Sequence, residues 1–207
     1  TGLMEHGTMR SAIVLVGGEA RRANGMEKYF FRFGGRTFIE RLVDSLLPVV
    51  DEIVLVARDG DQCRRFSHLR GVRCVSDIKK GIGPIGGIHA GVLASHGDIL
   101  FVCACDMPCV STAVVEVLFD ALGEEYDAVI PAWDREMLEP LHAVYRKEPL
   151  LQYLEDHTSL SLRDMVRELH SRFFPIEQLR QTDPALITFT NINKLEDLED
   201  ISPEDPL

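Results

Sequence analysis

The stretch from Ala12 to Lys28 constrains the fold more than any other part of the sequence, because an apolar run there breaks at two glycines. The run AIVLV, residues 12–16, is short and aliphatic, and Gly17-Gly18 follow it directly. This pattern is typical of a buried parallel strand that ends in a tight loop. Because glycine lets backbone N–H groups approach a ligand closely, the loop is a candidate anion site.

The loop after these glycines also carries positive charge. Arg21, Arg22 and Lys28 lie within it, and cations beside exposed N–H groups suit a phosphate. Neither GxxxxGKS/T nor GxGxxG follows the strand, so the loop is neither a P-loop nor the dinucleotide-binding fingerprint. The alternative that this stretch leaves open is a strand and a surface turn with incidental basic residues.

The size of the chain favours one globular domain. It has 207 residues, of which 45% are hydrophobic and 27% charged, which is enough for a sizeable core. We expect a single domain over residues 11–200, a frayed extension at residues 1–10 and a frayed acidic tail at residues 201–207. The net charge of −11 argues against a nucleic-acid-binding surface, but a local cluster of cations still allows a small anionic ligand.

Nothing in the sequence indicates membrane insertion or export. No apolar run approaches the length of a membrane span and residues 1–10 lack a signal-peptide core, so we expect a cytoplasmic location. Five cysteines, an odd number in a long chain, do not favour a disulfide framework. For Cys103, Cys105 and Cys109, packing at the end of an apolar strand explains the pattern better than zinc, since no paired CxxC accompanies them.

Apolar runs and helical patterns alternate along the rest of the chain. Thr37 and Glu40 predict a capping box at the start of a helix whose apolar positions extend to Leu47, and a glycine-rich segment leads into a helix with Leu93 facing inward. We expect further helices at 112–122, 150–155 and 160–170, a loop at 58–62, and strands at 53–57, 72–75, 99–103, 128–130, 173–176 and 187–190. This alternation predicts a three-layer α/β/α sandwich with a mainly parallel, Rossmann-like sheet and with ligands at the carboxyl ends of its strands.

The first loop resembles that of the molybdenum cofactor guanylyltransferases, the MobA-like branch of the nucleotidyltransferases. That family carries a Leu-Ala-Gly-Gly turn followed by an Arg, a Gly and an Asp-Lys pair. The corresponding residues here are Leu15, Val16, Gly17 and Gly18, then Arg22, Gly25, Glu27 and Lys28. The sequence departs from the family at Val16, Ala23, Asn24 and Glu27. The resemblance implies the nucleotide-diphospho-sugar transferase type of α/β fold.

Further segments in the same order extend the resemblance to roughly residues 11–198. Asp77 precedes a segment similar to the family's Gly-Pro-Leu-Ala-Gly, and Asp106 stands in a Cys-Asp-Xaa-Pro match. Residues 140–145 match Pro-Leu-His-Ala-Val-Tyr, residues 161–163 match Ser-Leu-Arg, and residues 191–193 match Asn-Xaa-Asn. Together the segments are specific, although the base-contacting Asn of the family is missing after the second strand, where Ala57 and Arg58 stand.

The resemblance implies transfer of GMP from GTP to the terminal phosphate of molybdopterin, which gives the guanine dinucleotide cofactor and pyrophosphate. It further implies that Leu15, Val16, Gly17 and Gly18 bind the nucleotide, that Arg22 and Lys28 balance phosphate charge, and that Asp106 holds Mg²⁺. Asp77 would read the guanine or the ribose, and Arg163, Asn191 and Asn193 would bind the pterin side. Strand alternation would place Asn191 and Asn193 on one face. Transient contacts with other cofactor-biosynthesis proteins or acceptor apoenzymes also follow from the resemblance.

Several alternatives remain open at this point. The missing Asn leaves CTP or a different phosphorylated acceptor as a rival substrate, and the divergence at Val16, Ala23 and Glu27 leaves a non-catalytic nucleotide-binding or partner-binding module. His142 is either catalytic or a satisfied core histidine, and the residue types favour the core. Trp133 either stacks on a pterin or packs on the core, and packing is the more frequent case.

Overall fold

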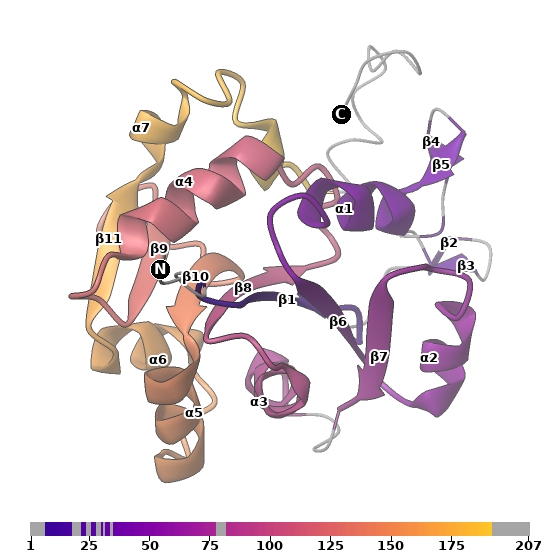
Figure 1. Cartoon of the computed structure of the whole chain (residues 1–207), viewed down its shortest axis with the longest axis horizontal. Helices are drawn as coiled ribbons and strands as arrows, with labels where there is room; N and C mark the ends of the chain where they lie inside the picture. The colour runs from indigo at the N-terminus through magenta and orange to yellow at the C-terminus, as the bar shows by residue number, and fades with distance from the viewer. Residues whose placement is uncertain are drawn as a thin grey trace, which may run out of the picture.

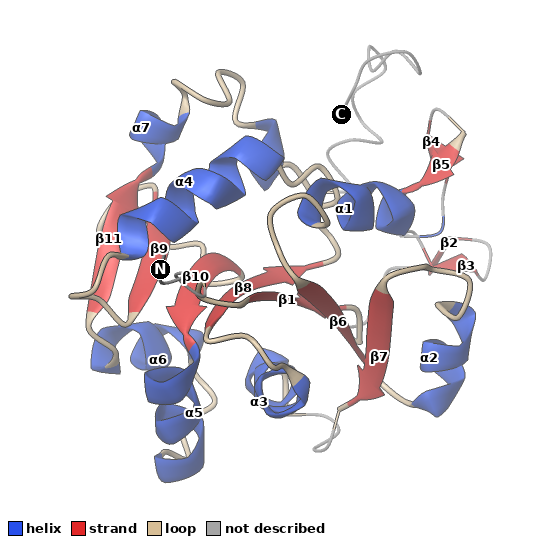
Figure 2. Cartoon of the chain, in the orientation of Figure 1, coloured by secondary structure: helices blue, strands red, loops and turns tan. Residues whose placement is uncertain are grey.

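A seven-stranded mixed sheet forms the centre of the protein in the computed structural model, which describes residues 7–17, 22–23, 26–27, 30, 32–33, 35–77 and 82–191 (Figures 1 and 2). The strand order is β11-β9-β10-β8-β1-β6-β7. The strands are β1 (Arg10–Leu15), β6 (Glu52–Ala57), β7 (Val72–Ser76), β8 (Ile99–Ala104), β9 (Ala128–Ala132), β10 (His142–Arg146) and β11 (Ser171–Pro175). Two short ribbons lie outside it, β2 (Arg22–Ala23) with β3 (Met26–Glu27) and β4 (Arg32–Phe33) with β5 (Arg36–Thr37).

The sheet is parallel except at β10. β1 pairs in parallel with β6 and β8, β7 pairs in parallel with β6, and β11 pairs in parallel with β9. β10 runs antiparallel to both β8 and β9. The mainly parallel sheet predicted from the sequence is therefore confirmed, and the carboxyl ends of β1, β6, β7 and β8 meet at one edge.

Helices cover both faces of the sheet, which confirms the three-layer architecture (Figures 1 and 2). On one side lie α1 (Phe38–Leu46), α4 (Thr112–Leu122) and α7 (Ile176–Leu179); on the other lie α3 (Pro84–Ala94), α5 (Lys147–Asp156) and α6 (Leu162–Glu168). α2 (Gly60–Arg65) packs beside the edge strand β7, and a short 3-10 helix, η2, spans Ile187–Phe189. Among the described residues, no helix combines the length and apolar character needed to cross a bilayer.

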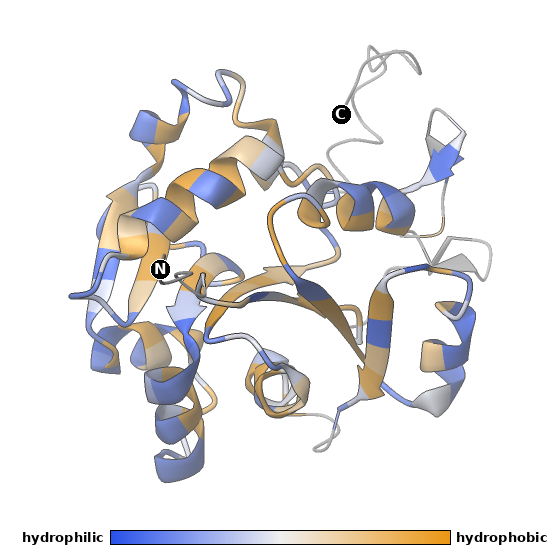
Figure 3. Cartoon of the chain, in the orientation of Figure 1, coloured by the Kyte–Doolittle hydropathy of each residue, from blue (hydrophilic) through white to orange (hydrophobic). Residues whose placement is uncertain are grey.

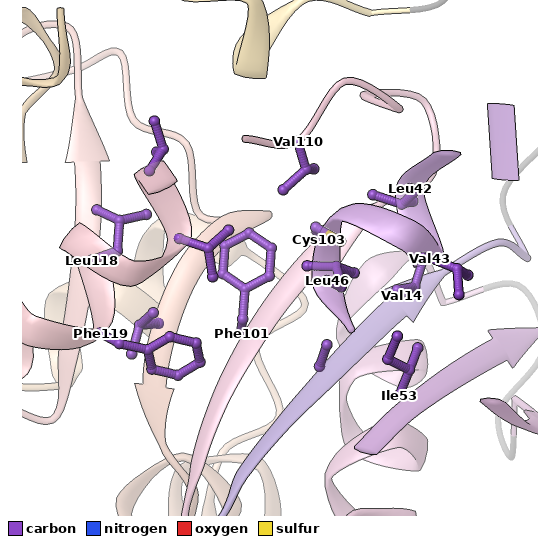
Figure 4. Close-up of a cluster of buried hydrophobic side chains, with 14 of the residues drawn as sticks. Val14, Leu42, Val43, Leu46, Ile53, Phe101, Cys103, Val110, Leu118 and Phe119 are labelled. Carbon is purple, nitrogen blue, oxygen red and sulfur yellow. The ribbon is translucent and has the colours of Figure 1, made fainter. Parts of the chain in front are cut away.

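Alternate residues of β1 point into two separate cores. Ala12, Val14 and Val16 join the core under α1 and α4, whereas Ile13 joins the core over α3. Figure 4 shows Val14 in the first core with side chains from α1, β8 and α4. Burial on both faces explains why the central strands are continuous apolar runs, and the apolar centre with polar outer helix surfaces is visible in Figure 3.

Helix α1 begins at the predicted capping box. The Thr37 hydroxyl accepts from the Glu40 N–H at 3.2 Å, and the Glu40 carboxylate accepts from the Thr37 N–H at 3.4 Å. Leu47, however, is 44% exposed, because it lies at the carboxyl cap beyond the turn that faces the sheet. Leu93 of α3 was also wrongly predicted to face inward: it is 50% exposed, since Ile88 and Val92 form the buried face one step around the helix.

Two other predictions from the sequence were wrong. Residues 58–62 do not form a loop throughout, because α2 starts at Gly60, with the Asp59 carboxylate capping the Gln62 N–H at 2.9 Å. Residues 187–190 do not form a strand. Leu186 adopts a left-handed conformation with φ 51°, and the chain then coils into η2.

At the amino ends of the parallel strands, a polar cluster of Glu52, Ser11, Arg73 and His96 links β6 to its neighbours. The Glu52 carboxylate accepts from the Ser11 hydroxyl at 2.8 Å, from the Arg73 guanidinium at 3.4 Å and from the His96 backbone N–H. Burial alone would raise the pKa of Glu52, but the hydrogen bonds from His96 and Ser11 outweigh it and lower the pKa to about 2. This Glu52 cluster lies at the opposite end of the strands from the edge where parallel sheets place ligands.

Candidate active site

The first residues after β1, Val16 and Gly17, lie between the segments that follow β6 and β8. Leu15, the last residue of β1, is in register with Val56 of β6 and with Ala104 of β8. The Val16 N–H donates to the Val56 carbonyl at 3.0 Å, and the Cys105 N–H donates to the Leu15 carbonyl at 3.1 Å. The start of the glycine loop is therefore adjacent to the segment that carries Asp106, as the sequence predicted.

Gly17 is needed because another backbone passes close to it. A Cβ atom at this position would lie 2.8 Å from the Arg58 nitrogen and 3.1 Å from the Ala57 carbonyl carbon. Both contacts are with backbone, so a side chain cannot be accommodated by a rotamer change. The glycine thus allows the end of β6 to close against the loop after β1.

The Gln62 side chain connects the same two segments, the end of β6 and the residues after β1. Its side-chain amide donates to the Val16 carbonyl at 3.0 Å and accepts from the Arg58 N–H at 2.7 Å, and the residue is fully buried. A buried amide with both ends bonded fixes the relative position of the two loops. Gln62 was not predicted as a site residue from the sequence, where the one local signal for it is the capping residue Asp59, which predicts a helix start at this point.

Asp77 lies where β7 ends, against the first turns of α3. Its N–H donates to the Ala57 carbonyl at 2.8 Å. A Cβ atom on Gly87 would lie 3.9 Å from the Asp77 carboxylate and 3.1 Å from the Leu15 side chain. Asp77, α3 and the end of β1 are therefore brought together.

The glycines of α3 allow this helix to approach the sheet. A Cβ atom on Gly91 would clash with the Ile13 side chain. The helix begins after Gly83, which has φ 76°, with Pro84 in its first turn. Gly83 supplies no side-chain cap and the first turn of α3 holds no acidic residue, so among the described residues Asp77 is the carboxylate beside the partial positive charge of this helix end.

Asp106 and Glu139 share one electrostatic environment. Asp106 follows β8 and is exposed as a residue, yet desolvation of its carboxyl group by the surrounding protein raises its pKa, partly offset by its own backbone N–H. The pKa of Glu139 is also raised, chiefly by burial and further by the charge of Asp106, although a hydrogen bond from Trp133 opposes this. The Trp133 indole donates to the Glu139 carboxylate at 3.0 Å. Glu139 was not predicted as a site residue; it precedes the Pro-Leu-His-Ala-Val-Tyr segment in the sequence.

His142 is a core residue rather than a catalytic one. It is fully buried, and its Nε2 lies 3.0 Å from the Thr188 hydroxyl. Its ring packs against Phe101 and Phe189, with centroids 5.3 Å and 4.7 Å away. Burial lowers the pKa to about 3, so the imidazole is neutral near pH 7 and a poor proton acceptor.

Trp133 belongs to a tight loop at the rim of this region. Its ring meets Phe189 edge-on with centroids 5.7 Å apart, and the residue is 41% exposed. The Asp134 carboxylate accepts from the N–H groups of Glu136 and Met137, both at 2.8 Å. Trp133 therefore packs on a neighbour, as expected, and still leaves part of its surface open to a ligand.

Arg163 and Asn191 lie on the side of the molecule that carries this loop. Arg163, near the start of α6, is exposed and donates to the Glu136 carbonyl at 3.1 Å. Asn191 is exposed and follows η2, which is anchored because the Thr188 hydroxyl accepts from the Ser111 N–H at 2.9 Å. Asn193 lies outside the described residues, so the predicted placement of Asn191 and Asn193 on one face stays a prediction.

Part of the predicted site lies outside the described residues. Gly18, Lys28 and Asn193 are among these, and for Arg22 only the backbone in β2 is described, paired with Glu27 of β3. Their proposed roles remain predictions. The described part of the site, by contrast, forms a continuous edge from Asp77 through residues 15–17 to Asp106.

Comparison with known proteins gives a consistent result. Residues 12–173 match the family model described as MobA-like NTP transferase domain. The chain is 39% identical over 203 residues to a probable molybdenum cofactor guanylyltransferase of Methanosarcina mazei, covering 94% of this chain and 90% of that protein. It is 32% identical to the molybdenum cofactor guanylyltransferase of Desulfosudis oleivorans, with 91% and 92% covered.

A solved structure shares this fold at substantial identity. The crystal structure of molybdopterin-guanine dinucleotide biosynthesis protein A from Archaeoglobus fulgidus matches with a TM-score of 0.74 and 34% identity, covering 90% of this chain and 94% of that one. A nucleotidyl transferase from Methanothermobacter thermautotrophicus, at 22% identity and a TM-score of 0.64, shows the same fold.

Proposed function

The chain belongs to the MobA-like NTP transferase family, and from this premise we propose that it is a molybdenum cofactor guanylyltransferase, which transfers GMP from GTP to the terminal phosphate of molybdopterin and releases pyrophosphate. The observation that carries the proposal is that the start of the glycine loop lies next to the segment of Asp106. The Cys105 N–H, one residue before Asp106, donates to the Leu15 carbonyl at 3.1 Å. A triphosphate along this edge would meet loop amides on one side and a carboxylate on the other.

The residues around Asp106 fit a magnesium ion. A hard cation prefers oxygen ligands, and one or two carboxylates suffice when substrate phosphates supply the rest. Among the described residues, none donates a side-chain hydrogen bond to the Asp106 carboxylate, and Glu139 adds negative charge to its surroundings. When bound, Mg²⁺ would neutralise charge on the α-phosphate and on the departing pyrophosphate. We assign Asp106 as its protein ligand.

The remaining residues would act by positioning and by balancing charge. The attacking group is a phosphate anion, so the reaction needs little general-base catalysis, which agrees with the neutral, buried state of His142. Backbone N–H groups of Gly17 and Gly18 would hold the triphosphate, and Arg22 and Lys28 would stabilise charge on the β- and γ-phosphates as pyrophosphate leaves.

The nucleoside and the acceptor would bind at opposite ends of this edge. Asp77, beside the uncapped start of α3, would accept hydrogen bonds from the guanine or the ribose. On the other side, Arg163, Asn191 and Asn193 would hold the pterin and its phosphate. The exposed ring surface of Trp133 would face this acceptor side, and its indole N–H is bonded to the Glu139 carboxylate.

One observation supports CTP as the alternative to GTP. The family's base-contacting Asn is absent, and Arg58 at this place pairs with Asp59 at 3.3 Å while its backbone bonds Gln62. Turnover with GTP and with CTP should therefore be compared in one assay. We expect GTP to be preferred, and a preference for CTP would assign the chain to the related cytidylyl transfer.

The test of the proposed function is the variant Asp106→Asn, assayed for pyrophosphate release with GTP, molybdopterin and Mg²⁺. Loss of the metal ligand should lower kcat by about 100-fold or more, while the melting temperature stays near that of the wild type because the residue is exposed. Asp120→Asn, at an exposed position of α4, is the matched control. Normal turnover by Asp106→Asn would refute the metal assignment, and absence of pyrophosphate release from the wild type with both nucleotides would indicate a non-catalytic module.

A further inference from the structure

Two half-buried cysteines meet between α2 and β7. The Sγ atoms of Cys63 and Cys74 lie 2.7 Å apart, although the residues are 11 positions apart in the chain. Non-bonded carbon atoms pack at about 3.5–4.0 Å, and sulfur is larger than carbon, so the two thiols are held closer than ordinary packing requires. Figure 1 shows α2 beside β7 at the end of the sheet, where the two elements are in contact.

We propose that Cys63 and Cys74 are a reversible disulfide site that locks α2 to β7 when the protein meets a low-molecular-weight disulfide. The Cys63 thiolate attacks one sulfur of the external disulfide and expels the other as a thiolate, which gives a mixed disulfide on Cys63. Cys74 then attacks the Cys63 sulfur and releases the second external thiol. Two electrons pass from the cysteine sulfurs to the external disulfide, and the two cysteine protons end on the two released thiols.

The order of attack follows from the surroundings of the two sulfurs. Burial, with a further contribution from Cys63, raises the pKa of Cys74 far above its ordinary value, which disfavours the Cys74 thiolate while both thiols are free. Cys63 lies on a short surface helix between Gln62 and two arginines, of which Arg64 is exposed. We therefore place the first attack at Cys63 and the closing attack at Cys74.

The bond would join two segments that position the candidate nucleotide site. The residue before Cys63 is Gln62, whose amide holds the Val16 carbonyl and the Arg58 N–H. The strand of Cys74 runs on to Asp77 at its carboxyl end. A covalent link between α2 and β7 would limit the motion of the edge strand relative to the glycine loop, and this consequence, unlike the bond itself, rests on the proposed function.

The bond is tested on the wild-type protein by mass. After incubation with glutathione disulfide, the chain should lose about two mass units, and peptide mapping should find Cys63 and Cys74 linked and protected from alkylation. The melting temperature should rise by roughly 5–10 °C relative to a sample kept in dithiothreitol, because the bond closes a short loop of the unfolded chain.

Cysteine-to-serine variants distinguish the Cys63–Cys74 disulfide from other oxidation products. Cys63→Ser and Cys74→Ser should each abolish both changes, whereas Cys105→Ser, at another half-buried cysteine, should retain them. Glutathione left attached to Cys63, a dimer linked between chains, or alkylation of both thiols after oxidation would overturn the proposal. Nucleotide affinity measured on the oxidised and reduced samples should differ by at least about twofold, and equal affinities would overturn the link to the site. If neither sample binds nucleotide, the proposed function fails while the mass result still decides the bond.

Discussion

The buried histidine of β10 should dominate the loss of stability between neutral and mildly acidic pH. His142 has a folded-state pKa of about 3 against an ordinary value of 6.5, because burial disfavours its charged form. A pKa that is lower in the folded state means that the unfolded chain binds the proton first. His142 therefore contributes stability that is complete above about pH 6.5 and is lost as the pH falls toward 3.

The size of the effect follows from these two pKa values. Between about pH 7.5 and about pH 5, the unfolded chain takes up most of one proton at His142 and the folded chain takes up almost none, which costs about 2 kcal/mol. Glu52, with a folded pKa of about 2 and an ordinary value of 4.5, contributes only a few tenths of a kcal/mol over the same interval. The histidine and the carboxylate are thus separated by the choice of pH range.

Urea unfolding at a series of pH values is the appropriate assay. With a slope of about 2 kcal/mol per molar urea, the wild-type midpoint should fall by about 1 M across this interval through His142 alone. His142→Gln is the matched variant, because it can keep a polar contact with Thr188 and does not titrate. It should be less stable near pH 7.5 and should lack this part of the pH dependence. If the variant loses stability with acid as steeply as the wild type, burial of the neutral imidazole is not the cause.

Two further predictions concern the two ends of the sheet. Gly17→Ala should destabilise the fold by about 1–3 kcal/mol and weaken nucleotide binding, because its Cβ would press on the Arg58 backbone at 2.8 Å. Urea unfolding and titration calorimetry measure this, with Gly60→Ala, where a Cβ meets open space, as the control; equal effects of the two changes would contradict the steric argument. Glu52→Gln should cost about 1–3 kcal/mol near pH 7, and the gap to the wild type should close as the pH falls from about 4.5 toward 2, since the lowered pKa stabilises the fold above this range. A gap that persists unchanged at low pH would show that the charge of Glu52 does not matter, and guanylyl transfer should be unaffected because Glu52 lies at the opposite end of β6 from Val56.

The architecture could be predicted because its strands are buried on both faces. Continuous apolar runs at β1, β6 and β8 marked a covered parallel sheet, and the Thr37–Glu40 box marked the start of α1. α2 escaped prediction because Gln62 is its sole buried residue, which leaves no apolar period to detect. The strand expected at 187–190 failed because the left-handed turn at Leu186 could not be inferred from an apolar residue.

The residues at the carboxyl ends of the parallel strands could be predicted as part of the candidate site. Contacts that depend on which strands become neighbours could not be predicted. Leu15, Gly17 and Asp106 follow neighbouring parallel strands, so their approach could be inferred from the sequence. Gln62 reaches a carbonyl 46 positions away, and the charge of Asp106 acts on Glu139 across an antiparallel strand pair. No periodicity in the sequence carries such contacts, because they depend on which strands become neighbours.

The distance between the Glu52 cluster and the ligand edge has a consequence for how such a protein can change. Glu52 starts β6 and Ala57 ends it, so groups that secure the fold and groups that would meet substrate occupy separate ends of the same strands. Replacements among exposed side chains on the ligand side of the molecule, such as Arg163 of α6 or Asn191 after η2, can then accumulate at little cost in folding stability. Laboratory selection for a new nucleotide or acceptor should therefore randomise exposed positions on the ligand side and leave the Glu52 cluster unchanged.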